Sequence, residues 1–440
     1  TTNGSFFRFR PETQRLIPFG SYSGTNPWGI TFDQWGWHLG SHPVFGNAAY
    51  ALNPPYPAQH LRAENFINAF TGTCGQEFIY SRHFPEELQG CYVRVRYKHV
   101  NTVELSRWVQ KDTHYEERKI GLLWQSKDLS FIPTDIRFGP RGDLYICDWY
   151  NPAKGHDQYS LRDTRRDKSN GRIWRVTAKG HALLHPAKIA GESIPALLEL
   201  LKSYEYRTRY TAKIELRERD RTEVRSALDA WLSALDPHDA KFEQHALEAL
   251  WMYRNVGAVN RELMTRLLRA SNENVRAAAM RELRWWQAAM PDPIGLLRQG
   301  ANDQSGLVRL EAVITAGYFG LGNWPVLENA GSRGANFGDV KGESMGVSAI
   351  DVALETLRHP MAPSLEYALR TTLDATKSIW VKDGAFLVKN FTALQQFIAK
   401  TDLPPPPRGT PPTPKDPFDA SSPTVVEIGT VPEQMRFTLE

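Results

Sequence analysis

The stretch IPTDIRFGPRGDLYICDWYN, residues 132–151, determines how the first part of this 440-residue chain is interpreted. Ile136 and Phe138 alternate with polar residues, and a second apolar run covers residues 144–147, beyond the segment GPRG at 139–142. Proline fixes φ and glycine permits positive φ, so this pattern predicts a β-hairpin with a tight turn. We therefore expect two antiparallel strands, one on each side of residues 139–142.

The same pattern recurs along the first 180 residues. Residues 27–36 match residues 133–142 at Pro, Ile, Phe and the closing Gly, 106 positions earlier, and residues 78–95 hold a partly matching hairpin. Hairpins repeated about every 50 residues are typical of β-propeller blades, of which a closed propeller needs roughly four to eight. We predict that residues 1–180 are the C-terminal part of a β-propeller, with the missing blades upstream of Thr1.

The hydrophobic period changes from 2 to 3.6 near Ala182. Similar four-residue segments begin at Arg209, Glu243, Arg276 and Arg309, with spacings of 34, 33 and 33, and each ends in Ala. An apolar residue follows each Ala four positions later, on the same helix face: Leu216, Leu250, Leu283 or Ala316. Repeats of this length predict a HEAT-like α-solenoid over residues 181–400. The fold class we expect is therefore multidomain, β followed by α.

The end of the chain has a different composition. Residues 401–423 are rich in proline and predict a stiff, extended linker, and residues 424–440 contain strand-like runs that suggest the start of a further, truncated β domain. The chain begins at Thr1 without Met and shows no signal peptide, so we expect it to be an internal piece of a longer protein.

Composition excludes several classes of function. A net charge of +4 is too small at this length to indicate a nucleic-acid partner, and no apolar run reaches the ~18 residues of a membrane helix. The three cysteines, Cys74, Cys91 and Cys147, form no C-x-x-C or haem-attachment motif. Cys147 alternates with apolar strand residues, which predicts a small buried side chain.

Two segments resemble a known family. They are CGQEFIYSRHFPEE at 74–87 and the run from DWYNP at 148–152, through Gly155-His156 and Arg166-Asp167, to GRIWRV at 171–176. Together they resemble the large exported proteins called PVC-type membrane-bound dehydrogenases. That resemblance implies a propeller related to glucose/sorbosone dehydrogenases joined to HEAT repeats, often with a cupredoxin-like or c-type cytochrome domain. It also implies an extracytoplasmic location, although no haem motif or copper-ligand set is present here.

The hairpin at 132–151 suggests a site, because the start of its first strand and the end of its second share one face of a propeller. Asp135 and Asp148 occupy these ends, and His42 takes the place of Asp148 in the earlier copy. Asn151 and His156 follow on the next loop. Carboxylate and amide oxygens suit Ca²⁺, and a histidine beside them suits general-base work on a hydroxyl. We therefore name His42, Asp135, Asp148 and His156 as candidate catalytic residues, with Asp135 and Asp148 as candidate Ca²⁺ ligands.

Structural roles compete with each of these assignments. Asp135 and Asp148 are equally suited to cap turns by accepting hydrogen bonds from backbone amides. Arg166, in the charge cluster at 162–167, could bind an acidic substrate or a quinone together with Asn151, or could join an ion-pair network that ties down the loop. His83 ends a strand, where a structural hydrogen bond is the expected role.

Two functions remain open. In the first, the chain is part of an extracytoplasmic dehydrogenase whose propeller holds a sugar-like or quinone ligand and passes electrons to domains outside this chain. In the second, propeller and solenoid form a non-catalytic scaffold that binds a glycan, or a protein partner through the solenoid. The dehydrogenase would be favoured if the loops around His42, Asp135, Asp148 and His156 converge on one pocket.

Overall fold

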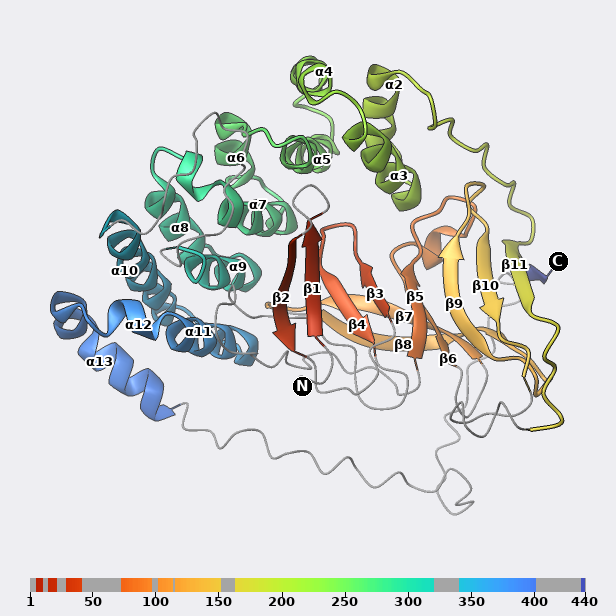
Figure 1. Cartoon of the computed structure of the whole chain (residues 1–440), viewed down its shortest axis with the longest axis horizontal. Coiled ribbons are helices and arrows are strands. Elements are labelled where there is room, and N and C mark those ends of the chain that lie inside the picture. Colours follow the sequence, from red (N-terminus) through yellow and green to blue (C-terminus); the bar gives the residue numbers. More distant parts are fainter. Residues whose placement is uncertain are drawn as a thin grey trace.

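The computed structural model describes residues 5–10, 15–21, 29–41, 73–96, 102–113, 115–151, 163–319, 340–400 and 437–439. Strands occupy the first part and helices the second, so the expected order of β followed by α is confirmed. The helices form an arc, and the strands lie along its inner side (Figure 1). The last strand before the helices ends at Ala178 and the first described helix begins at Ile194.

The described strands form four antiparallel sheets. Two sheets have two strands, β1-β2 and β3-β4, and two have four strands in the orders β5-β6-β7-β8 and β9-β10-β11-β12. The bounds are β1 Ser5–Arg10, β2 Arg15–Ser21, β3 Gly29–Phe32, β4 His38–Ser41, β5 Thr73–Phe78, β6 Tyr92–Arg96, β7 Thr102–Gln110, β8 Tyr115–Gln125, β9 Pro133–Phe138, β10 Leu144–Asp148, β11 Arg172–Ala178 and β12 Phe437–Leu439.

The hairpin predicted over residues 132–151 is present as β9 and β10. Leu144 pairs with Phe138 and Ile146 with Ile136, which places the apolar residues of both strands on one face. Gly142 in the turn has φ +80°, a conformation that favours glycine. The earlier copy forms the hairpin β3-β4. Both predictions of a hairpin are confirmed.

The two four-stranded sheets share one apolar core, to which Val93, Val103, Ile136, Ile146 and Val176 all contribute fully buried side chains. Among the described residues the sheets are open, and no closed ring of blades is seen. The propeller therefore stays a prediction.

The described end of the chain belongs to a sheet of the first part. Phe437–Leu439 pairs with Val176–Ala178 and forms the outer strand of the β9-β10-β11-β12 sheet, and the truncated β domain expected over 424–440 stays a prediction. An open strand edge accepts hydrogen bonds from any extended segment that reaches it, and β11 offers such an edge. Residues 401–436 lie outside the described residues.

The helical half alternates outer and inner helices along the arc (Figure 1). The bounds are α2 Ile194–Glu199, α3 Tyr206–Arg217, α4 Arg221–Ser233, α5 Phe242–Asn255, α6 Arg261–Leu267, α7 Glu273–Trp286, α8 Pro293–Ala301, α9 Gly306–Ala316, α10 Val340–Leu354, α11 Pro363–Ala375, α12 Lys377–Trp380 and α13 Gly384–Lys400, with short 3₁₀ turns at Glu86–Leu88, Leu200–Lys202, Gln287–Ala289 and Glu355–Arg358.

The repeated alanines are all buried, as the repeat alignment predicted. Ala212, Ala246, Ala279 and Ala312 lie on the inner helices α3, α5, α7 and α9 and are at most 1% exposed. A small side chain at this position lets neighbouring helices approach closely, and the apolar residue one turn later fills the space beside it. The 33-residue spacing is therefore a packing period of the helices.

A buried arginine near the start of three inner helices binds the loop that precedes the helix. Its Nη1 donates to the two carbonyl oxygens six and five residues earlier, in contacts of 2.7 to 3.0 Å: Arg209 to Ser203 and Tyr204, Arg276 to Ala270 and Ser271, and Arg309 to Asp303 and Gln304. We call this contact the arginine clamp. It satisfies carbonyl groups of the loop between the outer and the inner helix and joins that loop to the start of the inner helix.

The strands and the helices are joined into one body. Trp37, Phe78, Tyr92 and Tyr115 of the β half belong to the same buried core as the inner helices. Polar contacts surround this core, since Tyr115 donates to Asn274 Oδ1 at 2.9 Å and Gln110 bonds both Glu273 and Asn274 at the start of α7.

A loop of the β half also caps a helix. Asp112 Oδ1, between β7 and β8, accepts a 3.0 Å hydrogen bond from the backbone amide of Gly306, the first residue of α9. Ser305, the residue before the helix, makes no side-chain cap of its own. A methyl group at Gly306 would place its carbon 2.3 Å from Asp112 Oδ1, so only glycine permits this approach. The cap belongs to tertiary structure and positions the sheet against the array.

Ala279→Leu tests the packing period. The larger side chain overpacks the contact between neighbouring inner helices and should lower the free energy of unfolding by about 1–3 kcal/mol. The measurement is urea unfolding followed by circular dichroism, with Ala230→Leu on the exposed face of α4 as the control. If both variants unfold at the same urea concentration, Ala279 is not at a close helix contact.

Candidate functional site

Asp148, the strongest candidate from the sequence, is a buried structural acceptor. Its carboxylate receives four hydrogen bonds of 2.7 to 2.9 Å, from the backbone amides of Ile132 and Tyr150 and from the side chains of Arg172 and Trp174. Its side chain is fully shielded from solvent. The described contacts thus use both oxygens to fix the end of β10 against the start of β11.

Asp135 faces the other side of the sheet. In the β9-β10 register Asp135 is opposite Cys147, and Cys147 and Asp148 are successive residues whose side chains leave a strand on opposite faces. The Asp135 side chain is 44% exposed and pairs with Arg137 at 3.1 Å. Both carboxylates therefore lie at the same end of the hairpin, as its topology predicted, but on opposite faces of the sheet, and a shared ligand stays a prediction.

The same register corrects our expectation for Cys147. It shares a face with Asp135 and Ile173, and it is exposed, whereas Cys91 is the buried cysteine. An apolar run in a strand indicated burial, but this outer face carries apolar and polar side chains alike.

The other predicted site residues are partly outside the described chain. His42 and His156 lie there, so their convergence with Asp135 and Asp148 stays a prediction. Asn151 is buried, and its backbone amide donates to Ser130 at 2.9 Å. The guanidinium of Arg166 lies 5.2 Å from the centre of the Trp149 ring, a stacking contact within the loop.

Metal binding finds no support in the part of the chain that the structure describes. No group of three or more His, Cys, Asp or Glu side chains there could hold a metal ion. A Ca²⁺ site with six or more oxygen ligands needs such a group, or many carbonyls beside it. Calcium binding at Asp135 and Asp148 therefore stays a prediction.

His83 has the structural role that its position indicated. Nδ1 lies 3.0 Å from the carbonyl oxygen of Ala182, and Nε2 accepts from the backbone amide of Ala178 at 2.9 Å. The ring thereby joins the loop after β5 to the end of β11.

A buried carboxylate that the sequence argument did not single out lies where strands meet helices. Asp33, 2% exposed, follows β3 and accepts from the amides of Trp35 and Trp37, both at 2.9 Å. Arg281 of α7 donates to the Trp35 carbonyl at 3.0 Å and covers the Trp37 ring. Burial raises the pKa of Asp33 to about 6, and the amide bonds and Arg281 oppose this only in part.

These contacts give Asp33 a structural role, and its burial and raised pKa need no catalytic function. Its oxygen closes the turn that presents Trp37 to the helical core. A perturbed pKa is often a sign of an active site, but a buried turn acceptor at a domain junction produces the same effect.

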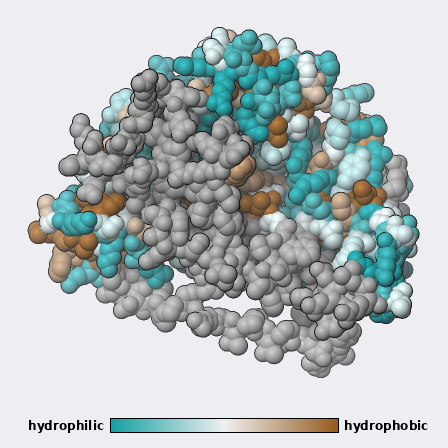
Figure 2. All heavy atoms as spheres, in the orientation of Figure 1, coloured by the Kyte–Doolittle hydropathy of each residue, from teal (hydrophilic) through white to brown (hydrophobic). Residues whose placement is uncertain are grey.

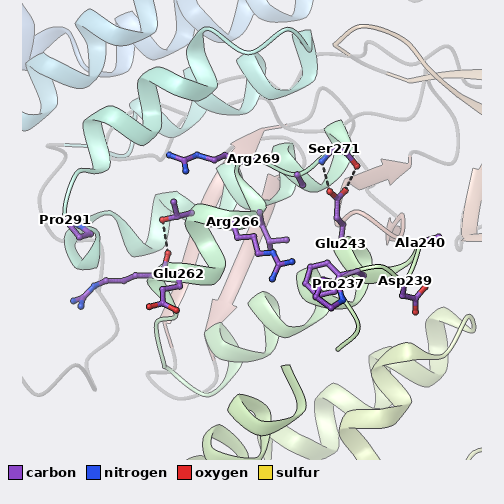
Figure 3. A pocket seen from close by; sticks show the side chains of 14 residues that line it. Pro237, Asp239, Ala240, Glu243, Glu262, Arg266, Arg269, Ser271 and Pro291 are labelled. Carbon is purple, nitrogen blue, oxygen red and sulfur yellow. Dashed lines mark hydrogen bonds between the residues drawn. The ribbon is translucent and has the colours of Figure 1, made fainter. Parts of the chain in front are cut away.

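A surface groove lies in the helical array (Figure 3). It has a volume of about 840 Å³ and runs between the α4–α5 loop and the α6–α7 loop. Pro237, Ala240 and Phe242 line one side, and Arg266, Arg269, Ser271 and Pro291 line the other. Apolar and charged side chains alternate around it.

The groove lies at a departure from the repeat. At the position of the arginine clamp, α5 carries Glu243, which cannot donate to the carbonyls of Pro237 and His238. Its carboxylate instead accepts from the amides of Ser271 (2.6 Å) and Asn272 (2.9 Å), at the far side of the groove. The α4–α5 loop therefore lacks the arginine contact of the equivalent loops and is joined to α5 by the amide of Phe242, which donates to the Asp239 carbonyl at 2.8 Å.

A second feature of the groove is the shortness of α6. It has 7 residues, against 13 in α4 and 9 in α8. A helix of two turns leaves the space beside the α4–α5 loop unfilled. The missing clamp and the short helix together account for the hollow.

Exposed apolar side chains also gather at one end of the helical array. Figure 2 shows a largely hydrophilic helical surface with apolar side chains gathered at the end of the array that carries α12 and α13. Val381, Val388 and Phe391 are the large exposed residues there. None of the described helices is both long enough and apolar enough to cross a membrane.

Asp148→Ala tests the structural assignment of Asp148. Four donors lose their acceptor, two of them backbone amides, and the free energy of unfolding should fall by about 3 kcal/mol or more. Asp135→Ala is the matched control, and its exposed carboxylate should contribute little. Urea unfolding measures both. A wild-type melting temperature that rises with calcium, and loses this rise in Asp148→Ala, would contradict the assignment and restore the calcium site.

Asp33→Asn tests the buried junction by pH. Because the folded-state pKa of Asp33 lies above its ordinary 3.8, the carboxyl stabilises the fold fully below about pH 4, and this contribution is lost as pH rises through about 6. Asparagine keeps the acceptor without the charge. The variant should exceed the wild type in stability at pH 7 by up to about 3 kcal/mol, and match it near pH 4. Parallel pH profiles of the melting temperature would show that Asp33 is not buried in this way.

Comparison with known proteins adds one similarity. Residues 47–180 match a family model described as a domain of unknown function, DUF7133. The match includes both four-stranded sheets apart from β12, and it does not extend to the helical array. No curated protein and no solved structure matches the chain.

Proposed function

We propose that this chain is a non-catalytic binding platform, and that the groove between the α4–α5 and α6–α7 loops holds an extended segment of a protein partner. The observation that carries this proposal is the place of the groove, at the inner helix where Glu243 replaces the arginine clamp. A repeat array changes its surface where one repeat departs from the pattern, and such positions are suited to binding.

The size and lining of the groove support a polypeptide ligand. A volume of about 840 Å³ exceeds that of a single side chain and suits several residues of an extended segment. Pro237, Ala240 and Phe242 offer apolar contact, and the arginines opposite offer hydrogen-bond donors. The inner side of the array is already covered by the strands, so the outer edge is the surface left for a partner.

A dehydrogenase function is less well supported than a binding role. The four hydrogen bonds to Asp148 occupy the carboxylate that the dehydrogenase reading needs as a base or ligand, and Asp135 lies on the other face. The scaffold alternative therefore agrees better with the described geometry than the dehydrogenase does.

The propeller and HEAT assignments belong to this proposal as well. Two four-stranded antiparallel sheets that pack face to face support neighbouring propeller blades, and buried alanines at a period of 33 support HEAT-like repeats. The resemblance to PVC-type membrane-bound dehydrogenases is a separate reason to propose an extracytoplasmic location.

Selection of peptides from a random display library tests the platform. The wild-type chain should enrich a family of related peptides, and Ala240→Trp, which fills the groove from the exposed α4–α5 loop, should lose them. Ala230→Trp, on the exposed face of α4 and away from the groove, is the matched control and should keep them. Enrichment that survives Ala240→Trp would contradict the proposal. Turnover of a sugar with a quinone acceptor, abolished by His156→Ala, would replace it with the dehydrogenase.

A further inference from the structure

The groove contains two arginines whose charge is not matched within the described chain. Arg266 lies in the last turn of α6 and Arg269 follows its end, and both are exposed. Neither forms an ion pair with any described residue, although most arginines of the inner helices do. Figure 3 shows the Arg266 side chain extending across the groove toward Pro237.

The Arg266 guanidinium is held in a defined orientation. It lies 4.1 Å from the centre of the Phe242 ring, at the start of α5 on the opposite side. Stacking on an aromatic ring fixes the plane of the guanidinium and leaves the N–H groups at its edge free to bind. A planar fork of donors fits a carboxylate with two parallel hydrogen bonds.

The acidic residues of the groove do not neutralise these arginines. Although burial works against its charge, the amides of Asn272 and Ser271 hold the pKa of Glu243 below its usual range. These amides begin α7, so they and the helix dipole already compensate that carboxylate. Asp239 accepts from the amide of Lys241 in its own loop, and Glu262, one turn before Arg266 on α6, forms no ion pair with it among the described contacts.

We infer that the partner segment is acidic and that Arg266, stacked on Phe242, binds a carboxylate of that segment, with Arg269 adding a second positive charge. This inference rests on the proposed platform and names the chemistry of its ligand. The apolar side chains of the groove contact the remainder of the segment, and the Arg266 contact determines which segments are accepted.

The probe is a short fluorescein-labelled peptide that alternates glutamate with small residues, beside a twin with glutamine at every glutamate. Binding to the wild-type chain is measured by fluorescence anisotropy. The glutamate peptide should bind about tenfold or more tightly than its twin, because a charge-assisted bidentate contact is lost in the twin. Its affinity should fall as salt is added, since salt screens exposed charges.

Substitutions of Arg266 and Arg221 distinguish a specific bidentate contact from general attraction by positive charge. Arg266→Gln should reduce the preference for glutamate over glutamine to about equality, and Arg266→Lys, which keeps the charge but not the planar fork, should restore only part of it. Arg221→Gln at the exposed start of α4, outside the groove, removes one charge as well and should leave the preference unchanged.

The outcomes distinguish this inference from the proposed function. Equal binding of both peptides to the wild type, or a preference that Arg266→Gln leaves intact, overturns the acidic specificity while the platform stands. A library that yields no peptide dependent on the groove overturns the platform itself. Binding of the glutamate peptide that Arg266→Gln and Arg221→Gln weaken equally would mean general charge attraction, and would also overturn the specific contact.

Discussion

The arginine clamp is the contact on which the helical half depends. At the start of α3, α7 and α9 one guanidinium joins two loop carbonyls to a helix, and the arginine is buried in each case. Burying a charged group is costly unless it is hydrogen-bonded, and in these three repeats the loop carbonyls supply acceptors for one end of the guanidinium. The clamp therefore joins each of these loops to the start of its inner helix, and the buried alanines set the distance between the helices. Where Glu243 replaces the arginine, the clamp is absent and the groove lies beside the α4–α5 loop.

The strands of the β half cover the inner side of the helical array. Trp37 and Tyr115 enter the helical core, and Asp112 caps α9 from the β half. These contacts need the inner helices to begin at fixed positions, which the clamp provides. Strands and helices are therefore one rigid unit, and a partner is left with the outer edge, where the loops between helices lie.

Periodic features were predictable from the sequence, and single contacts were not. The hairpin at 132–151 and the helical repeat follow from local rules, since turn residues and apolar spacing act over a few positions. The roles of Asp148 and Cys147 depend on which face of the sheet each side chain takes, and a register error of one residue reverses that. The pairing of Phe437–Leu439 with β11 was not predictable, because the two strands lie far apart in the chain. The groove was missed too, although one signal was visible: Glu243 stands where the other three repeats have arginine.

The most direct test of this account is the affinity of an acidic groove-binding peptide for the Glu243→Arg variant. The substitution restores the clamp, so the α4–α5 loop should close onto α5 and binding should weaken about tenfold or more. Simple electrostatics predicts the opposite, because the change removes a negative charge from the groove and adds a positive one. Weaker binding by a variant that circular dichroism shows to be folded would support the account, with Glu243→Gln as the control for lost contacts to α7. Equal or tighter binding would contradict it.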